Sequence, residues 1–396
     1  MAEISKKDQF ILPEGVVYLD GNSLGPMPKT VPQRMQSVVA DEWAQLLIGG
    51  WNKAGWMAMP EQVGDSVGRL IGAPKGSVVM GDTLSIKVYQ ALAAGVKLRP
   101  ERRVILSDTG NFPSDLYIAE GLVGLLGQGY ELRTVAPEDV ADAIGEEIAV
   151  VMLTEVDYRT GRKHDMKTIT EMAHAAGAVM VWDLAHSAGA LPVDLAGSNC
   201  EFAVGCTYKY LNSGPGGPAF IYVRPDLADT VEPALAGWLG HARPFDFDLN
   251  YTPGAGIERM RVGTPPVLQL AALEESMKLW EDVDMDALRA ASIALQEQFI
   301  EEVEAAAPQL TLASPRDAQV RGSQVSFRFE HGYAAMQALI ARGVVGDFRA
   351  PDIMRFGFTP LYIDASDVSK AVGIIADVMN NDLWDDAQYK VRSRVT

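Results

Sequence analysis

A chain of 396 residues is long enough to form one large domain and a smaller second one. Its hydrophobic fraction of 48% and charged fraction of 22% are those of an ordinary soluble globular protein, and no apolar run reaches the roughly 18 residues of a membrane span. The formal net charge of −18, without a basic cluster, argues against a nucleic-acid-binding protein.

The cysteine content is low and points to a reducing compartment. Cys200 and Cys206 lie in or beside a predicted buried strand, where a small core residue is the favoured interpretation. Two cysteines at this spacing form neither a disulfide framework nor a zinc motif. The first residues of the chain lack the apolar core of a signal peptide. We therefore expect a cytoplasmic protein.

The N-terminal part of the chain predicts a short strand at residues 16–20, a turn-rich loop at 21–28, and a helix from about Lys29. A region rich in tryptophan follows between Trp43 and Trp56, and clustered tryptophans usually serve packing. No internal repeat or low-complexity segment is present in the sequence.

Strands and helices then alternate. A strand at 77–82 leads into an amphipathic helix at 83–97, whose first hydroxyl groups suit either an N-cap or an anion site. Further strands are predicted at 103–107, 131–135 and 148–154, and a helix at 165–177 has an Asp cap and a Gly stop. This alternation predicts a mainly parallel sheet with helices on both faces.

The two central strands carry the residues with the clearest chemistry. Asp183 ends one apolar strand, and Lys209 follows the next one. A carboxylate at the end of a buried strand is costly unless it has a partner. Side chains at the ends of neighbouring parallel strands converge on the crevice where open α/β sheets bind ligands. An amine and a carboxylate in one crevice suit pyridoxal phosphate, which needs a lysine to bind it and an acid beside its ring nitrogen.

From about residue 286 the pattern changes to a long helix, short strands and a final amphipathic helix at 365–380, typical of a smaller α+β domain. We expect an N-terminal segment at 1–45 that packs with the small domain, a large cofactor-binding domain at 46–265, and the small domain at 266–396. Within the last, Arg355 leads an apolar stretch and by its position alone could form an ion pair at a sheet edge.

Three motifs together resemble the kynureninase family. They are Asp-Leu-Ala-His-Ser-Ala-Gly-Ala-Leu-Pro at 183–192, Gly-Cys-Thr-Tyr-Lys-Tyr-Leu-Asn at 205–212, and Gly-Pro-Gly-Gly at 214–217. The family belongs to the class V aminotransferase branch of the fold type I pyridoxal-phosphate enzymes. The resemblance implies their α/β fold, with a large domain built on a mainly parallel seven-stranded sheet and a smaller α+β domain.

The resemblance also implies the roles of individual residues. Lys209, Tyr208 and Asp183 are expected to be catalytic, with Tyr208 a partner in acid–base steps. The expected contacts to the cofactor are Leu84, Ser85, Phe112, Pro113, Ser114, Asp115, Thr154, Asp183, His186, Tyr208, Lys209, Trp238 and Thr264. Thr264 corresponds to a phosphate contact given by the neighbouring subunit, so the resemblance implies a homodimer with shared sites.

For the substrate, the resemblance implies contacts from Ser23, Trp51 and Arg355, with Trp56 and Arg349 as the alternatives to the last two. The implied reaction is hydrolysis of L-kynurenine, and possibly of 3-hydroxykynurenine, to anthranilate and L-alanine in tryptophan catabolism.

Three other functions match the sequence less well. Cysteine desulfurases and selenocysteine lyases place His before the lysine and Gln three residues after the aspartate, where this chain has Tyr208 and His186, and they use a mobile C-terminal cysteine that it lacks. A class V aminotransferase is less well matched at Phe-Pro-Ser-Asp (112–115) and Thr-Pro-Pro (264–266). A catalytically inactive relative is disfavoured by the presence of Lys209 and Asp183.

Overall fold

The computed structural model describes residues 4–392. Its largest element is a seven-stranded sheet whose strand order is β4-β10-β9-β8-β7-β5-β6. Five neighbouring strands, β9 to β6 in that order, run parallel, and β10 is antiparallel to both of its neighbours. The strands are β4 (Val78–Met80), β5 (Val104–Asp108), β6 (Glu131–Val135), β7 (Ile148–Thr154), β8 (Val179–Asp183), β9 (Phe202–Gly205) and β10 (Phe220–Val223).

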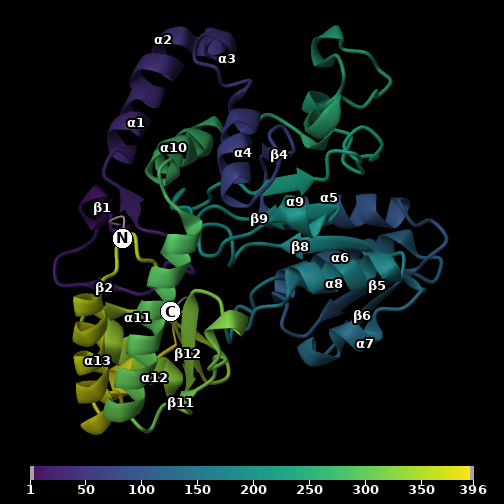
Figure 1. Cartoon of the computed structure of the whole chain (residues 1–396). Helices are drawn as coiled ribbons and strands as arrows, with labels where there is room; N and C mark the ends of the chain where they lie inside the picture. The colour runs from purple at the N-terminus through teal and green to yellow at the C-terminus, as the bar shows by residue number, and fades with distance from the viewer. Residues whose placement is uncertain (1–3, 393–396) are drawn as a thin grey trace.

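Helices cover both faces of this sheet because both faces of its strands are apolar. In β8, Val179 and Val181 face the cluster that contains α5 and α6, whereas Met180 and Trp182 face the cluster that contains α4 and α8. Figure 1 shows these layers. The helices of this part are α4 (Met59–Leu70), α5 (Leu84–Lys97), α6 (Pro113–Leu126), α7 (Val140–Ala143), α8 (Met166–Ala175), α9 (Leu195–Ser198) and α10 (Val267–Met277).

The C-terminal part forms a second, four-stranded antiparallel sheet in the order β11-β12-β15-β14. The long helix α11 packs against α13, beside this sheet (Figure 1). The elements are α11 (Met285–Ala306), β11 (Thr311–Leu312), β12 (Gln324–Arg328), α12 (Gly332–Ile340), β13 (Val344–Val345), β14 (Asp347–Arg349), β15 (Ile353–Gly357), α13 (Ala365–Asn380) and α14 (Ala387–Lys390).

The N-terminal segment is tied to this second part. Strand β2 (Val17–Tyr18) pairs in parallel with β13, and the Gly357 N–H donates to the carbonyl of Leu19 at 2.7 Å. A small ladder of β1 (Phe10–Ile11) and β3 (Met27–Pro28) precedes α1 (Val31–Ser37), a π-helical segment (Val38–Trp43), α2 (Ala44–Leu46) and α3 (Gly50–Lys53). The exact boundaries of the three predicted domains stay a prediction.

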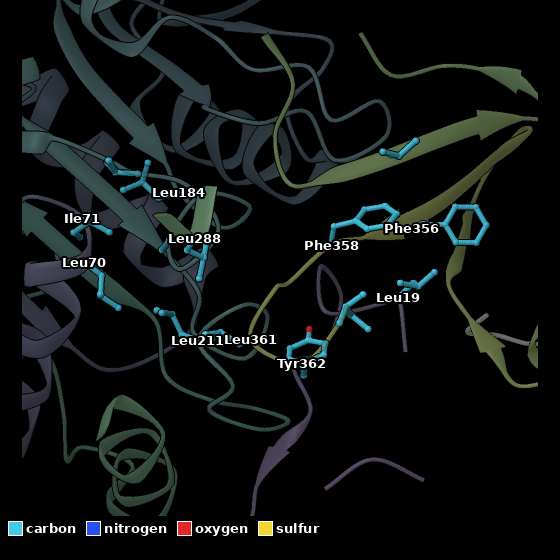
Figure 2. Close-up of a cluster of buried hydrophobic side chains, with 14 of the residues drawn as sticks. Leu19, Leu70, Ile71, Leu184, Leu211, Leu288, Phe356, Phe358, Leu361 and Tyr362 are labelled. Atoms are coloured by element: carbon cyan, nitrogen blue, oxygen red, sulfur yellow. The ribbon is translucent and has the colours of Figure 1, made fainter. Parts of the chain in front are cut away.

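One apolar core joins the two parts. Figure 2 shows Leu70 and Ile71 at the end of α4, Leu19 from the N-terminal segment, and Phe356 and Phe358 from the second sheet within the same buried cluster. The two parts of the chain are therefore packed together through a continuous apolar cluster. Among residues 4–392, no helix is both long and apolar enough to cross a membrane.

The predicted fold class is confirmed, and several element bounds agree closely with the structure. The predicted strands at 131–135 and 148–154 and the final helix at 365–380 have the observed bounds. The Asp165 carboxylate caps α8 by accepting from the Thr168 N–H, as the pattern predicted. Helix α10 ends at Met277, and the chain continues as a 3₁₀ turn, Lys278–Trp280.

Candidate active site

The carboxyl ends of the central strands open onto a cavity of about 390 Å³. Thr154 ends β7, Asp183 ends β8 directly beside it in register, and Lys209 follows β9. Parallel strands bring these three side chains to one edge of the sheet. The cavity is lined by Asn22, Ser23, Thr83, Leu84, Ser85, Phe112, Ser114, Asp115, Thr154, Tyr158, Asp183, Ala185, His186, Cys206, Tyr208, Lys209, Gly216, Gly217, Arg349 and Arg355.

Lys209 lies against His186 in this cavity. Its Nζ is 3.0 Å from the His186 Nε2. Burial, followed by the positive charge of Lys209, lowers the pKa of His186 well below its usual value. The imidazole is therefore neutral at physiological pH, and its Nε2 accepts a hydrogen bond from the lysine. This contact fixes the position of the lysine amine without giving it a negative partner.

Two buried carboxyl groups, Asp183 and Asp115, lie together behind the lysine. Burial raises the pKa of Asp183 to about 6, while the charge of Lys209 and a hydrogen bond from the Ala185 N–H (2.9 Å) oppose the rise. Burial and the negative charge of Asp183 raise the pKa of Asp115 well above its ordinary value. At neutral pH the pair therefore carries one negative charge, on Asp183, because two adjacent buried carboxylates repel each other.

Two helix N-termini face the cavity on another side. Helix α5 begins at Leu84 and α6 at Pro113, and each has 14 residues. The hydroxyl oxygens of Ser85 and Ser114, one from each helix, are 3.1 Å apart. The free N–H groups and positive dipole ends of two helices, with two hydroxyl groups between them, form a site suited to an anion such as phosphate.

Phe112 immediately precedes α6. Its ring is 42% exposed, which is unusual for a phenylalanine, and its edge contacts the ring of Tyr158 at 5.1 Å between centroids. The Lys209 Nζ lies 6.0 Å from the centre of the same ring. An exposed aromatic face above a lysine in a cavity is available to stack on a flat ligand.

The second sheet contributes two arginines and a carboxylate to the opposite wall. The Arg355 Nε donates to one oxygen of Asp347 at 2.6 Å, and the Arg349 Nη2 lies 2.7 Å from the other oxygen. Burial disfavours the charge of Asp347, but Arg355 and Arg349 outweigh this effect and hold its pKa below the ordinary value. The Ser23 hydroxyl donates to the same carboxylate at 2.5 Å.

Sequence reasoning missed Asp347, Asn22 and Tyr158 as members of this site. Asp347 faces Arg355 only because β14 and β15 pair with these two residues in register. No local sequence pattern marks such a pairing, since it depends on which strands become neighbours. The glycine-rich turn after Lys209 was visible in the sequence and does line the cavity, through Gly216 and Gly217.

Four of the predicted site residues do not line the cavity of this chain. Pro113 is the first residue of α6 and lies beside the lining residues Phe112 and Ser114. The ring of Trp51 on α3 packs against Trp56 at 5.7 Å between centroids. Trp238, in the 3₁₀ turn Trp238–Gly240, is 44% exposed, and Thr264 is exposed.

Comparison with known proteins identifies similar chains. A family model described as "Kynureninase C-terminal domain" matches residues 288–375. A kynureninase from Pseudomonas fluorescens is 50% identical over 397 aligned positions, which cover 98% of this chain and 95% of that protein. A kynureninase from Burkholderia pseudomallei (strain 1106a) is 48% identical with the same coverage.

Solved structures show the same fold at low sequence identity. The apo cysteine desulfurase from Thermococcus onnurineus NA1 has a TM-score of 0.81 at 20% identity, covering 95% of this chain and 98% of that one. The cysteine desulfurase CsdA from Escherichia coli has a TM-score of 0.77 at 21% identity, with the same coverage. At these identities the similarity concerns the fold alone.

Proposed function

The chain belongs to the kynureninase family, and we propose that it catalyses the pyridoxal-phosphate-dependent hydrolysis of L-kynurenine to anthranilate and L-alanine. The full-length similarity to kynureninases at about half identity carries this proposal. The bond that breaks lies between Cβ and Cγ of the substrate, and water supplies the hydroxyl group of the released aromatic acid.

The residues of the cavity fit pyridoxal phosphate. Lys209 offers an amine for its aldehyde carbon, and Asp183 offers a buried negative charge for its ring nitrogen. The two helix N-termini with Ser85 and Ser114 suit its phosphate. We further propose that Phe112 stacks on the ring and that Leu84, Pro113, Asp115, Thr154 and His186 complete its surroundings.

When bound, the cofactor stabilises the negative charge that develops on the substrate carbons next to the broken bond. We propose that the Lys209 amine takes the proton from Cα, since it is the basic group in the cavity held beside a neutral imidazole. The neighbouring Cys206 and burial raise the pKa of Tyr208, so its hydroxyl keeps its proton and can donate it in the later steps. Arg355 and Ser23 are proposed to position the amino-acid end of the substrate.

A cysteine desulfurase activity is the main alternative, because the structural neighbours include such enzymes. It would need a reactive thiolate. The sequence contains only Cys200 and Cys206, and both are buried. Burial raises the pKa of Cys206 and raises that of Cys200 to about 12, so both thiols stay protonated and unreactive. The buried thiols therefore disfavour a cysteine desulfurase, and the full-length similarity to kynureninases disfavours a class V aminotransferase.

One assay separates these functions. Purified protein reconstituted with pyridoxal phosphate should release fluorescent anthranilate and an equal amount of L-alanine from L-kynurenine. Sulfide release from L-cysteine, or keto-acid formation with an amino acceptor, should be negligible beside it. The same assay with 3-hydroxykynurenine reports which of the two substrates is preferred. Sulfide release without anthranilate would contradict the proposal.

We also propose that the protein is a homodimer with shared active sites. Apolar side chains that are exposed in the single chain support this, for example Trp43, Leu47 and Ile48 on the N-terminal helical arm, of which Ile48 is 81% exposed. In a dimer, Trp51, Trp238 and Thr264 could reach the cavity of the other subunit, although none lines the cavity of its own chain. A cytoplasmic location is proposed from the two buried free thiols.

A further inference from the structure

The N-terminal loop places a polar side chain without a partner in the wall of the active-site cavity. Asn22 lines the cavity, is fully buried, and neither its amide nitrogen nor its amide oxygen has a hydrogen-bond partner among residues 4–392. Burying an amide without partners costs on the order of 1–3 kcal/mol. A ligand that completes its hydrogen bonds would recover that cost.

The loop that carries Asn22 is firmly held. The N–H groups of Ser23 and Leu24 donate to the Asp20 carbonyl at 2.9 and 3.0 Å, and the Gly25 N–H donates to the carbonyl of Tyr208 at 2.8 Å. The last bond ties the loop directly to the residue before Lys209. The amide of Asn22 packs on Gly357, where a Cβ would lie 2.3 Å from its Oδ1. The hydrogen-bonded backbone of the loop and the contact with Gly357 therefore fix the position of the amide.

The neighbouring arginine has few donors left for a substrate. A guanidinium has five N–H donors. In Arg355, Nε and Nη2 donate to Asp347, Nη2 also donates to Ser23, and Nη1 donates to the Tyr158 carbonyl. These contacts occupy four donors and leave one, on Nη1. Arg355 therefore cannot bind a substrate carboxylate through two hydrogen bonds while its Nε and Nη2 groups donate to Asp347.

The Ser23 hydroxyl, in contrast to Arg355, has no donor left. Its single hydroxyl proton is used in the bond to Asp347, and its oxygen accepts from Arg355 at 3.0 Å and from Arg349 at 3.4 Å. A carboxylate only accepts hydrogen bonds, so Ser23 cannot bind one without breaking its contact with Asp347. Among residues 4–392, the unused donors on this wall include those of the Asn22 amide and the remaining N–H groups of the two arginines.

We infer that Asn22 donates a hydrogen bond to the α-carboxylate of the substrate, sharing it with the free N–H of Arg355, and that Ser23 acts as a positioning residue through Asp347. The inference rests on the proposed function and assigns the substrate contact expected of Ser23 to its neighbour. The arginines supply the positive charge, and the hydrogen bond from Asn22 orients the carboxylate.

The test compares L-kynurenine with its α-carboxamide, using the holoenzyme at pH 8. The Asn22→Asp substitution keeps the shape of the side chain but exchanges its donor for an acceptor. It should lower kcat/KM for L-kynurenine by roughly ten- to a hundredfold and shift the acid-over-amide preference towards the carboxamide. Asn380→Asp, an exposed asparagine at the end of α13 outside the cavity lining, should leave both values unchanged.

A second variant separates this role from a structural one. Asn22→Ala removes an amide that has no partner in the ligand-free protein, so the Tm of the ligand-free protein should not fall, while kcat/KM for L-kynurenine does. The dissociation constant for pyridoxal phosphate should stay within about twofold of wild type. A lower Tm with unchanged discrimination, or weaker cofactor binding with unchanged discrimination, would overturn the inference.

The two levels of the proposal fail differently. If the wild-type holoenzyme releases no anthranilate from L-kynurenine, the proposed function is wrong, and the role of Asn22 is wrong with it. If the wild-type enzyme is active and Asn22→Asp discriminates acid from amide as wild type does, only the role of Asn22 is overturned.

Discussion

The lysine at the centre of the site has a neutral partner and sits near a charged one. His186 contacts Lys209 directly, while Asp183 acts on it through space. The amine is thus positioned by an acceptor that does not neutralise it, and the carboxylate stays available for the cofactor. In the proposed mechanism, the group that moves protons, Lys209, is therefore separate from the group that holds the charge, Asp183.

Replacing Lys209 by Ala should abolish the reaction. With no amine to bind the cofactor or to move the Cα proton, kcat should fall by roughly a thousandfold or more, about 4 kcal/mol of barrier. Borohydride should also no longer fix the cofactor to the chain, which mass spectrometry of the reduced protein measures. Lys97→Ala, at the far end of α5 in a half-exposed ion pair with Glu232, is the matched control. Near-normal turnover of Lys209→Ala would show that Lys209 is not the residue that binds the cofactor and moves the Cα proton.

Cofactor affinity should depend on pH through Asp183. Burial raises the pKa of this carboxyl group to about 6 in the cofactor-free protein, so it is charged above pH 6 and neutral below. A positively charged ring nitrogen needs the charged form, and affinity should therefore fall as the pH drops through 6. The same shift makes the cofactor-free fold less stable as the pH rises from 3.8 to about 6, because the unfolded chain releases this proton first.

The measurement is the dissociation constant for pyridoxal phosphate between pH 5 and 8, in wild type and in Asp183→Asn. The variant should bind more weakly at pH 8 and lose the part of the pH dependence that belongs to the protein. Titration of the free cofactor contributes equally to both curves, so their difference isolates Asp183. If the dissociation constants of wild type and Asp183→Asn depended on pH in the same way, the ring nitrogen would contact a group other than Asp183.

At the scale of elements, the anion site is built from two helices rather than from one loop. Helices α5 and α6 each bring an N-terminus and a serine, and the two hydroxyl oxygens touch at 3.1 Å. The helices follow β4 and β5, which are not neighbours in the sheet. Their approach therefore depends on packing between α5 and α6 above the sheet, and the pair of serines is a product of that packing.

Ser85→Ala or Ser114→Ala should each weaken binding of pyridoxal phosphate by roughly tenfold, about 1.4 kcal/mol, through loss of one hydrogen bond to a charged group. Because the two hydroxyl groups contact each other, the double variant should lose less than the sum of the single losses. Equilibrium dialysis measures the dissociation constant of the cofactor for wild type, the two single variants and the double variant. Ser66→Ala, on the exposed side of α4, is the control. Strict additivity would mean that the serines act separately.

At the scale of the whole molecule, the cavity exists because two parts of the chain meet. The large sheet supplies Lys209 and Asp183, the second sheet supplies Arg355 and Asp347, and the N-terminal loop supplies Asn22 and Ser23. The shared core shown in Figure 2 packs these three parts of the chain against one another. Pairing of β2 with β13 makes the N-terminal loop part of the wall that carries the arginines.

Complementation between variants should reveal whether the sites are shared. Thr264→Asp places a negative charge where the partner's phosphate is expected, and Lys209→Ala disables its own chain. Each variant alone should be inactive. Mixed dimers should regain one intact site, so refolding the two variants together in equal amounts should restore about a quarter of wild-type turnover. If Thr264 serves its own chain instead, the mixture stays inactive, and light scattering checks that dimers form.

The sequence by itself determined most strands of the large sheet and the chemistry at their ends, but it did not predict the antiparallel strand β10. Apolar runs with a carboxylate and an amine at their ends predict where strands stop, and parallel strands stop at one edge. The sequence alone therefore placed Asp183 and Lys209 together, and Thr154 joined them through the family resemblance. The motifs around Asp183 and Lys209 then indicated the family, which the full-length relatives confirm.

Only the tertiary structure decided the cavity wall that carries Asn22 and Arg355. The contact of Asp347 with Arg355 depends on the register of β14 and β15, and the burial of Asn22 depends on Gly357 beside it. Asn22 and Gly357 are more than 300 residues apart in the chain, and neither pairing leaves a periodic trace in the sequence. Whether a donor is free or already used is likewise a property of the folded chain, because hydrogen-bond capacity is spent by neighbours in space rather than in sequence.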